Sequence, residues 1–208
     1  MTASEERHEH ANALTHGVGL VAGVFGCTIL LVMAAGSGDP WRIVTTAVFA
    51  TTVILVYASS TLYHSARSLQ RRAQLKLLDH CAVYLLIAGS YTPFALVGLR
   101  GRLGWSLFGI LWILAGLGIL FKLHFIGGSR LISTTTYVGM SLLAILPMGA
   151  LLRELGPVTL GWLLLGGVFY LSGLRFYLGG RIPYNHAIWH LFVIAGTACH
   201  GVAVGTQL

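Results

Sequence analysis

Seven long apolar runs, separated by short segments rich in glycine, proline or charge, restrict the fold of this sequence more than any other feature. They cover residues 14–35, 42–64, 77–98, 104–124, 131–152, 158–178 and 186–206. A helix needs roughly 20 mostly apolar residues to cross the hydrocarbon core of a bilayer, and each run is about that long. We therefore predict an all-α integral membrane protein, a bundle of seven transmembrane helices.

Too few charged residues are present for a soluble domain. Only 9% of the 208 residues are charged, whereas soluble domains contain about 25%. Seven spans with tight connections use nearly the whole chain, so we expect a single membrane domain over residues 1–208 with a short N-terminal tail at 1–13. The tail lacks the basic segment and short apolar stretch of a cleavable signal peptide, so the first run is expected to remain as a helix.

Lysine and arginine residues predict the orientation, because they concentrate in cytoplasmic loops. Nine of the 13 basic residues fall at one set of alternate helix ends and four at the other. The larger group is Arg7, Arg67, Arg71, Arg72, Lys76, Lys122, Arg130, Arg175 and Arg181, and the smaller is Arg42, Arg100, Arg102 and Arg153. We expect a cytoplasmic N-terminus and an outside C-terminus. The same bias explains the net charge of +7, so no nucleic-acid partner is predicted.

Ionisable residues in membrane spans are functional candidates, because burying them in lipid costs several kcal/mol unless they are paired. Asp79 is the one carboxylate at the mouth of a predicted helix; the others lie in the tail or in loops. His64 ends the second predicted helix, while His186 and His190 open the seventh. The predicted topology places these four residues in one layer at the cytoplasmic face.

The histidines in this layer are suited to zinc. His186 and His190 are four positions apart and share one helix face. With His64 they could supply three nitrogen ligands to a tetrahedral zinc, leaving a fourth position for water whose pKa falls to about 7. We predict one Zn2+ per chain. The alternative for two histidines at a membrane interface is simple contact with headgroups and water.

Two further residues are predicted to take part in catalysis. Asp79 would orient or deprotonate the water. Ser60, one turn before His64, could donate a hydrogen bond to that water, to Asp79 or to a developing oxyanion. A hydroxyl bonded to its own helix carbonyl is the alternative for Ser60.

Polar residues at the start of the first helix form another group. Glu9, Asn12 and His16 fall at i, i+3 and i+7, on one helix face. We predict that they form a polar lid or support the metal ligands from outside. His200 lies too far along the last helix to join this metal, and we expect it to hydrogen-bond within the bundle.

These motifs together resemble the bacterial haemolysin III family, relatives of the progestin and adiponectin receptor family of seven-helix membrane proteins. The resembling segments are Glu9 to Gly17, Ser60-x-x-x-His64, Leu78-Asp79-His80, Gly89 to Phe94 and His186-x-x-x-His190. The resemblance implies a zinc ion near the cytoplasm, held by His64, His186 and His190 with Asp79 and Ser60 beside it. It also implies a bacterial plasma membrane location and, because alkaline ceramidases belong to the same wider group, hydrolysis of a lipid amide or ester.

Three functions remain open at this point. The first is a zinc-dependent hydrolase, with membrane lipids as environment and substrate and no protein partner. The second is a non-enzymatic sensor or homeostasis factor in which zinc is structural. The third is a transporter or a cytolytic protein; the nearly uncharged outer half of the predicted bundle and the lack of an amphipathic pore-forming segment disfavour it.

Overall fold

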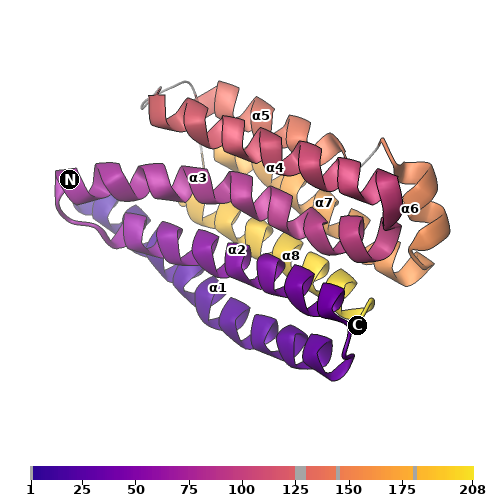
Figure 1. Cartoon of the computed structure of the whole chain (residues 1–208). Helices are drawn as coiled ribbons and strands as arrows, with labels where there is room; N and C mark the ends of the chain where they lie inside the picture. Colours follow the sequence, from indigo (N-terminus) through magenta and orange to yellow (C-terminus); the bar gives the residue numbers. More distant parts are fainter. Residues whose placement is uncertain (1, 125–129, 144–145, 180–181) are drawn as a thin grey trace.

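The computed structural model describes residues 2–124, 130–143, 146–179 and 182–208. Within these ranges the chain forms eight α-helices and one π-helical segment, η1. They are α1 (Ala3–Gly36), α2 (Pro40–Ser65), α3 (Leu69–Pro93), η1 (Phe94–Leu99), α4 (Gly101–His124), α5 (Arg130–Leu142), α6 (Met148–Glu154), α7 (Pro157–Leu178) and α8 (Asn185–Gly205). The N- and C-termini lie at opposite ends of the bundle (Figure 1).

The all-α expectation is confirmed for the described residues. Six helical stretches are long and apolar enough to cross a bilayer, namely α1, α2, α3 with η1, α4, α7 and α8. The expected span at 131–152 is instead divided into α5, of 13 residues, and α6, of 7 residues. Pro147 directly precedes α6. Proline has no backbone N–H to donate, and in a helix interior its ring clashes with the preceding turn.

Two helices begin earlier than the apolar runs predict. The first begins at Ala3 rather than near residue 14, because Thr2 and Glu5 form a capping box: Glu5 N donates to Thr2 Oγ1 at 3.3 Å and Thr2 N donates to Glu5 Oε2 at 2.7 Å. The third begins at Leu69 rather than 77, with Ser68 as its N-cap. Both helices therefore carry polar turns beyond their apolar segments.

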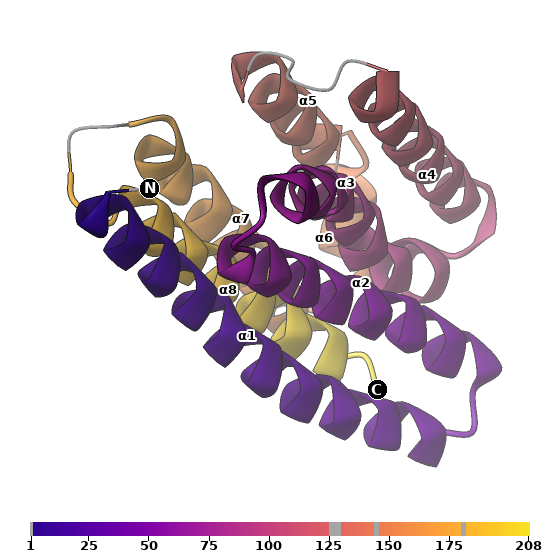
Figure 2. The ribbon, with the colours of Figure 1, turned by 90° about the vertical axis from the view of Figure 1, so that its left-hand side faces the viewer.

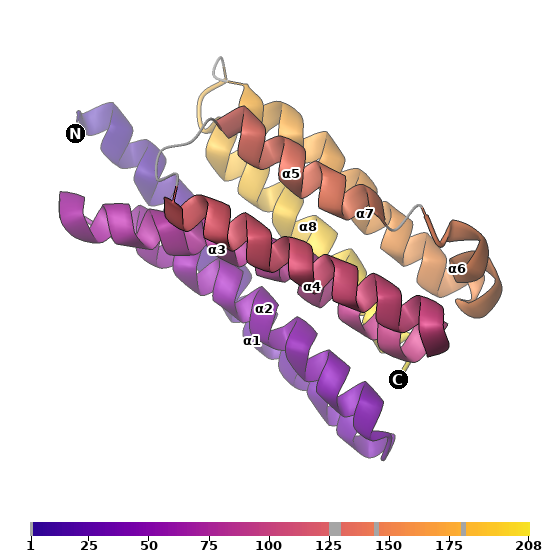
Figure 3. The same ribbon diagram turned by 45° about the horizontal axis from the view of Figure 1, so that its top comes forward.

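The helices enclose an interior between α2, α3, α7 and α8. Figure 2 shows α8 between α1 and α7, with α2 beside both α1 and α3. The helices α5 and α6 follow one another alongside α7, and α4 packs on α3 (Figure 3). Large side chains on the outer faces of α1 and α4 are exposed, among them Phe25 at 70% and Ile113 at 65%. Such apolar outer faces suit contact with lipid.

Close packing around η1 depends on glycine at position 104. A Cβ atom built there would lie 2.1 Å from the backbone oxygen of Ala95, which cannot move aside as a flexible side chain could. Gly109, on the same helix, has no atom within 4 Å of the corresponding position. We expect Gly104→Ala to lower the free energy of unfolding by about 1–3 kcal/mol.

Thermal unfolding of the detergent-purified protein, followed by circular dichroism, measures this effect. Gly109→Ala is the matched control and should change the stability by less than about 0.5 kcal/mol. Equal melting temperatures for the two variants would contradict the packing described for α4.

Candidate metal centre

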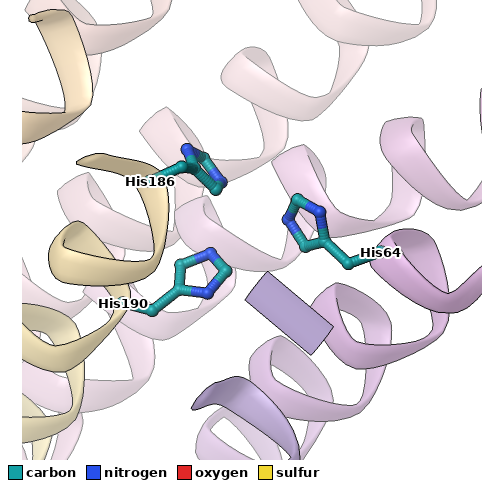
Figure 4. Close-up of side chains that lie close together, drawn as sticks. All are labelled: His64, His186 and His190. Carbon is teal, nitrogen blue, oxygen red and sulfur yellow. The ribbon is translucent and has the colours of Figure 1, made fainter. Parts of the chain in front are cut away.

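Three histidine rings converge at the end of the bundle that carries the N-terminus. His64 comes from the last turn of α2, and His186 and His190 from the first turns of α8 (Figure 4). One ring nitrogen of each lies within 4.8 Å of those of the other two. Zinc binds histidine nitrogens at about 2.0–2.1 Å, so small ring rotations would suffice to surround one ion. His64 and His190 are buried.

The ring of His64 is oriented by a carboxylate. Its Nδ1 lies 2.6 Å from Glu9 Oε2, and the other Glu9 oxygen lies 2.5 Å from Arg72 Nη2. Because an ionised carboxylate only accepts hydrogen bonds, Nδ1 of the neutral ring carries the hydrogen and Nε2 the lone pair. That Nε2 is buried without a hydrogen-bond partner. A carboxylate on the far nitrogen of a histidine is the usual support for a metal ligand.

The ring of His190 is held in the same tautomer by α1. Its Nδ1 lies 3.2 Å from the backbone oxygen of Asn12 and 3.0 Å from Thr15 Oγ1. Since a backbone carbonyl only accepts, Nδ1 is the donor and Nε2 keeps its lone pair. The Thr15 hydroxyl donates in turn to the backbone oxygens of Ala11 and Asn12, both at 2.9 Å.

These features fit a metal ion that prefers imidazole. Two of the three rings are fixed with Nε2 available, and the buried Nε2 of His64 lacks any other partner among the described residues. Three histidines leave one position of a tetrahedral zinc open, as catalytic sites do. The residues present therefore fit the zinc ion that the sequence predicts, and the identity of the ion stays a prediction.

The structure brings Ser60 and Asp79 to the same place. Ser60 is 1% exposed on α2 and lines the same cavity as Asp79 of α3. Ser59 illustrates the alternative of bonding within the helix, since its hydroxyl donates to the Val56 oxygen at 3.1 Å. The Ser60 hydroxyl has no hydrogen-bond partner among the described residues. Asp79 belongs to none of the ion pairs among the described residues.

The three polar residues of α1 also lie beside the histidines. Glu9 contacts His64, the Asn12 carbonyl contacts His190, and the His16 ring stacks on His190 with a centroid distance of 3.5 Å and an angle of 13°. His16 is only 4% exposed. The three residues thus lie on one face of α1, as their spacing predicts. Their role stays a prediction.

Sequence reasoning missed two contributors, Thr15 and Arg72. Thr15 lies inside the first apolar run, next to His16, but its position in the sequence does not indicate a contact with α8. Arg72 is one of several basic residues before the third run, and nothing in the sequence distinguishes it from the others. His200 is as expected: it is buried, and its Nε2 donates to the Leu163 oxygen at 3.2 Å.

A cavity of about 810 Å³ extends from the histidines into the bundle. Asp79, Ser60 and the three histidines line one end, and mostly apolar side chains of α3, α5, α7 and α8 line the rest. Two α7 residues of its wall, Leu164 and Val168, are 48% and 57% exposed. The wall along α7 therefore offers accessible apolar surface. Its volume lies in the range of small-molecule sites.

Known proteins are similar to this sequence over nearly its whole length. A family model described as "Haemolysin-III related" matches residues 5–201. The chain is 42% identical over 192 residues to the Hemolysin-3 homolog of Bacillus subtilis (strain 168), covering 92% of this chain and 90% of that protein. Hemolysin-3 of Bacillus cereus is also 42% identical over 192 residues, covering 92% and 88%.

A more distant similarity extends to mammals. The monocyte to macrophage differentiation factor of Homo sapiens is 27% identical over 210 residues, which cover 97% of this chain and 85% of that protein. The range of the family model includes every residue of the histidine cluster and of the α1 face beside it. With its apolar helices, the chain is a multi-pass membrane protein that belongs to the haemolysin-III related family.

Proposed function

We propose that this protein is a zinc-dependent membrane hydrolase that cleaves the amide or ester bond of an acyl lipid. The observation that carries the proposal is the histidine cluster with two rings fixed in the metal-binding tautomer, next to a carboxylate without an ion-pair partner among the described residues. The apolar cavity that begins at this cluster has room for an acyl chain.

The proposed roles follow from the contacts of each residue. When bound, zinc supplies Lewis acidity that polarises a carbonyl group and makes water acidic enough to lose a proton near neutral pH. His64, His186 and His190 hold the ion. The Asp79 carboxylate accepts the proton of the attacking water and returns it to the leaving amine or alcohol, which is general base and general acid catalysis.

The surrounding residues orient these groups. Ser60, whose hydroxyl has no other partner among the described residues, orients the Asp79 carboxylate or donates a hydrogen bond to the substrate's carbonyl oxygen. Glu9 and Thr15 keep the two imidazoles in place from α1. The apolar walls of the cavity exclude bulk water and accommodate the acyl chain.

We further propose seven membrane crossings, with α5 and α6 together as the fifth, and a cytoplasmic N-terminus in a bacterial plasma membrane. Termini at opposite ends of the bundle require an odd number of crossings (Figure 1). The division of basic residues between the two ends supports this orientation.

Metal content tests the ligand assignment. Wild-type protein purified in detergent without chelators should contain about one zinc per chain by inductively coupled plasma mass spectrometry, and His64→Ala and His190→Ala should lose it. Glu9→Gln should weaken zinc binding about 10–100-fold, because the carboxylate that supports His64 is removed. His124→Ala, an exposed histidine on α4, is the control. Wild-type protein without metal would contradict the assignment.

Replacing Asp79 separates catalysis from a structural role of zinc. Asp79→Asn should retain the metal and lower the turnover of a fluorescent acyl lipid about 10²–10⁴-fold, since the general base is lost. The exposed Glu154, changed to glutamine, serves as the control and should leave turnover unchanged. Zinc-loaded wild-type protein that hydrolyses neither lipid amides nor lipid esters would favour the structural alternative.

Alkaline phosphatase fusions test the number of crossings, because this reporter is active only outside the cytoplasm. Fusions after Leu155 and after Leu208 should be active, and a fusion after Arg67 should be inactive. If α5 and α6 do not cross the membrane, the fusions after Leu155 and Leu208 will be inactive as well.

A further inference from the structure

A buried lysine lies in the wall of the cavity. Lys122, in the last turn of α4, is 6% exposed and lines the same cavity as the histidine cluster. Its Nζ lies 3.4 Å from Nδ1 of His80 on α3. None of the ion pairs among the described residues includes Lys122. An ammonium group taken out of water is strongly destabilised unless an anion accompanies it.

Among the residues that the structure describes, no carboxylate pairs with Lys122. Two carboxylates among the described residues line the cavity, Glu9 and Asp79. Glu9 is bound between His64 and Arg72, and Asp79 forms no ion pair with Lys122. The carboxyl end of α4 favours a nearby cation, but a helix end carries only about half an elementary charge. The helix end therefore compensates only part of the Lys122 charge, and a bound anion could compensate the rest.

A second lysine, Lys76, lines the same cavity as Lys122. Lys76 lies one helical turn before His80 on α3. Tyr137 of α5 donates a hydrogen bond to the backbone oxygen of His80 at 3.0 Å, so α5 closes the cavity next to the two lysines. Lysine binds phosphate as a point charge. The attraction is stronger at the buried Lys122 than at Lys76, which is exposed.

We propose that Lys122 and Lys76 bind the phosphate group of an anionic phospholipid. The lipid's acyl chains occupy the apolar part of the cavity, and its ester group lies toward the histidine cluster. That this lipid is also the substrate depends on the proposed hydrolase function; its binding does not. It narrows the substrate class from any acyl lipid to one with a phosphate-bearing headgroup. Inorganic phosphate shares the recognised chemistry and is the other source of such an anion.

Native mass spectrometry of the detergent-solubilised protein tests the binding without turnover. The probes are dioleoyl phosphatidylglycerol, dioleoylglycerol, which has the same ester-linked chains without phosphate, and inorganic phosphate. We expect the wild type to bind phosphatidylglycerol at least tenfold more tightly than dioleoylglycerol. Lys122→Met should abolish most of that preference and Lys122→Arg should keep it. Lys76→Gln should reduce it in part, and Arg153→Met, an exposed change on α6, should have no effect.

Three outcomes would overturn the inference. They are equal binding of the two lipids by the wild type, an unchanged preference in Lys122→Met, and phosphate that displaces phosphatidylglycerol completely at millimolar concentration. The first needs no variant, so it holds even if a substitution prevents folding. Zinc content is measured on the same samples. Metal-free wild type that still prefers phosphatidylglycerol would contradict the proposed hydrolase and support the headgroup site, so the two proposals fail separately.

Discussion

The site depends on the two contacts of the Glu9 carboxylate, because they join three helices at one point. Glu9 belongs to α1, His64 to α2 and Arg72 to α3, and the two contacts of the carboxylate are 2.6 Å and 2.5 Å long. The cation of Arg72 compensates the charge of the half-buried Glu9, so the carboxylate can stay ionised and fix the His64 ring. If this link were removed, α1 would lose its polar connection to α2, while α8 would still hold α1 through His190.

The positions of the histidines could be predicted from the sequence because they depend on helix periodicity and topology alone. A spacing of four residues places His186 and His190 on one face in any helix. Alternating helix directions then bring the end of α2 to the start of α8. The ring orientations could not be predicted, since they depend on Asn12, Thr15 and Glu9, whose contacts are made across helices.

The helix ends and the break between α5 and α6 were predicted less well, for a physical reason. Apolar runs mark where lipid contact is favourable, not where a backbone stops being helical. Capping at Thr2 and Ser68 extends α1 and α3 into polar sequence. Conversely, α5 ends at Leu142 and α6 begins only after Pro147, inside a run that hydropathy alone treats as continuous. The cavity could not be predicted either, because its volume depends on how far α5 and α7 stand apart.

The apolar wall of the cavity along α7, which includes Leu164 and Val168, has a kinetic consequence for a lipid ligand. A lipid that enters the cavity from the bilayer diffuses in the plane of the membrane, so the water phase is not its reservoir. Its effective concentration is its mole fraction in the surrounding leaflet, and dilution with other lipids slows the encounter even when the amount of protein and ligand in the sample is unchanged. The protein's affinity for such a lipid is therefore expressed relative to the mole fraction of the lipid in the membrane.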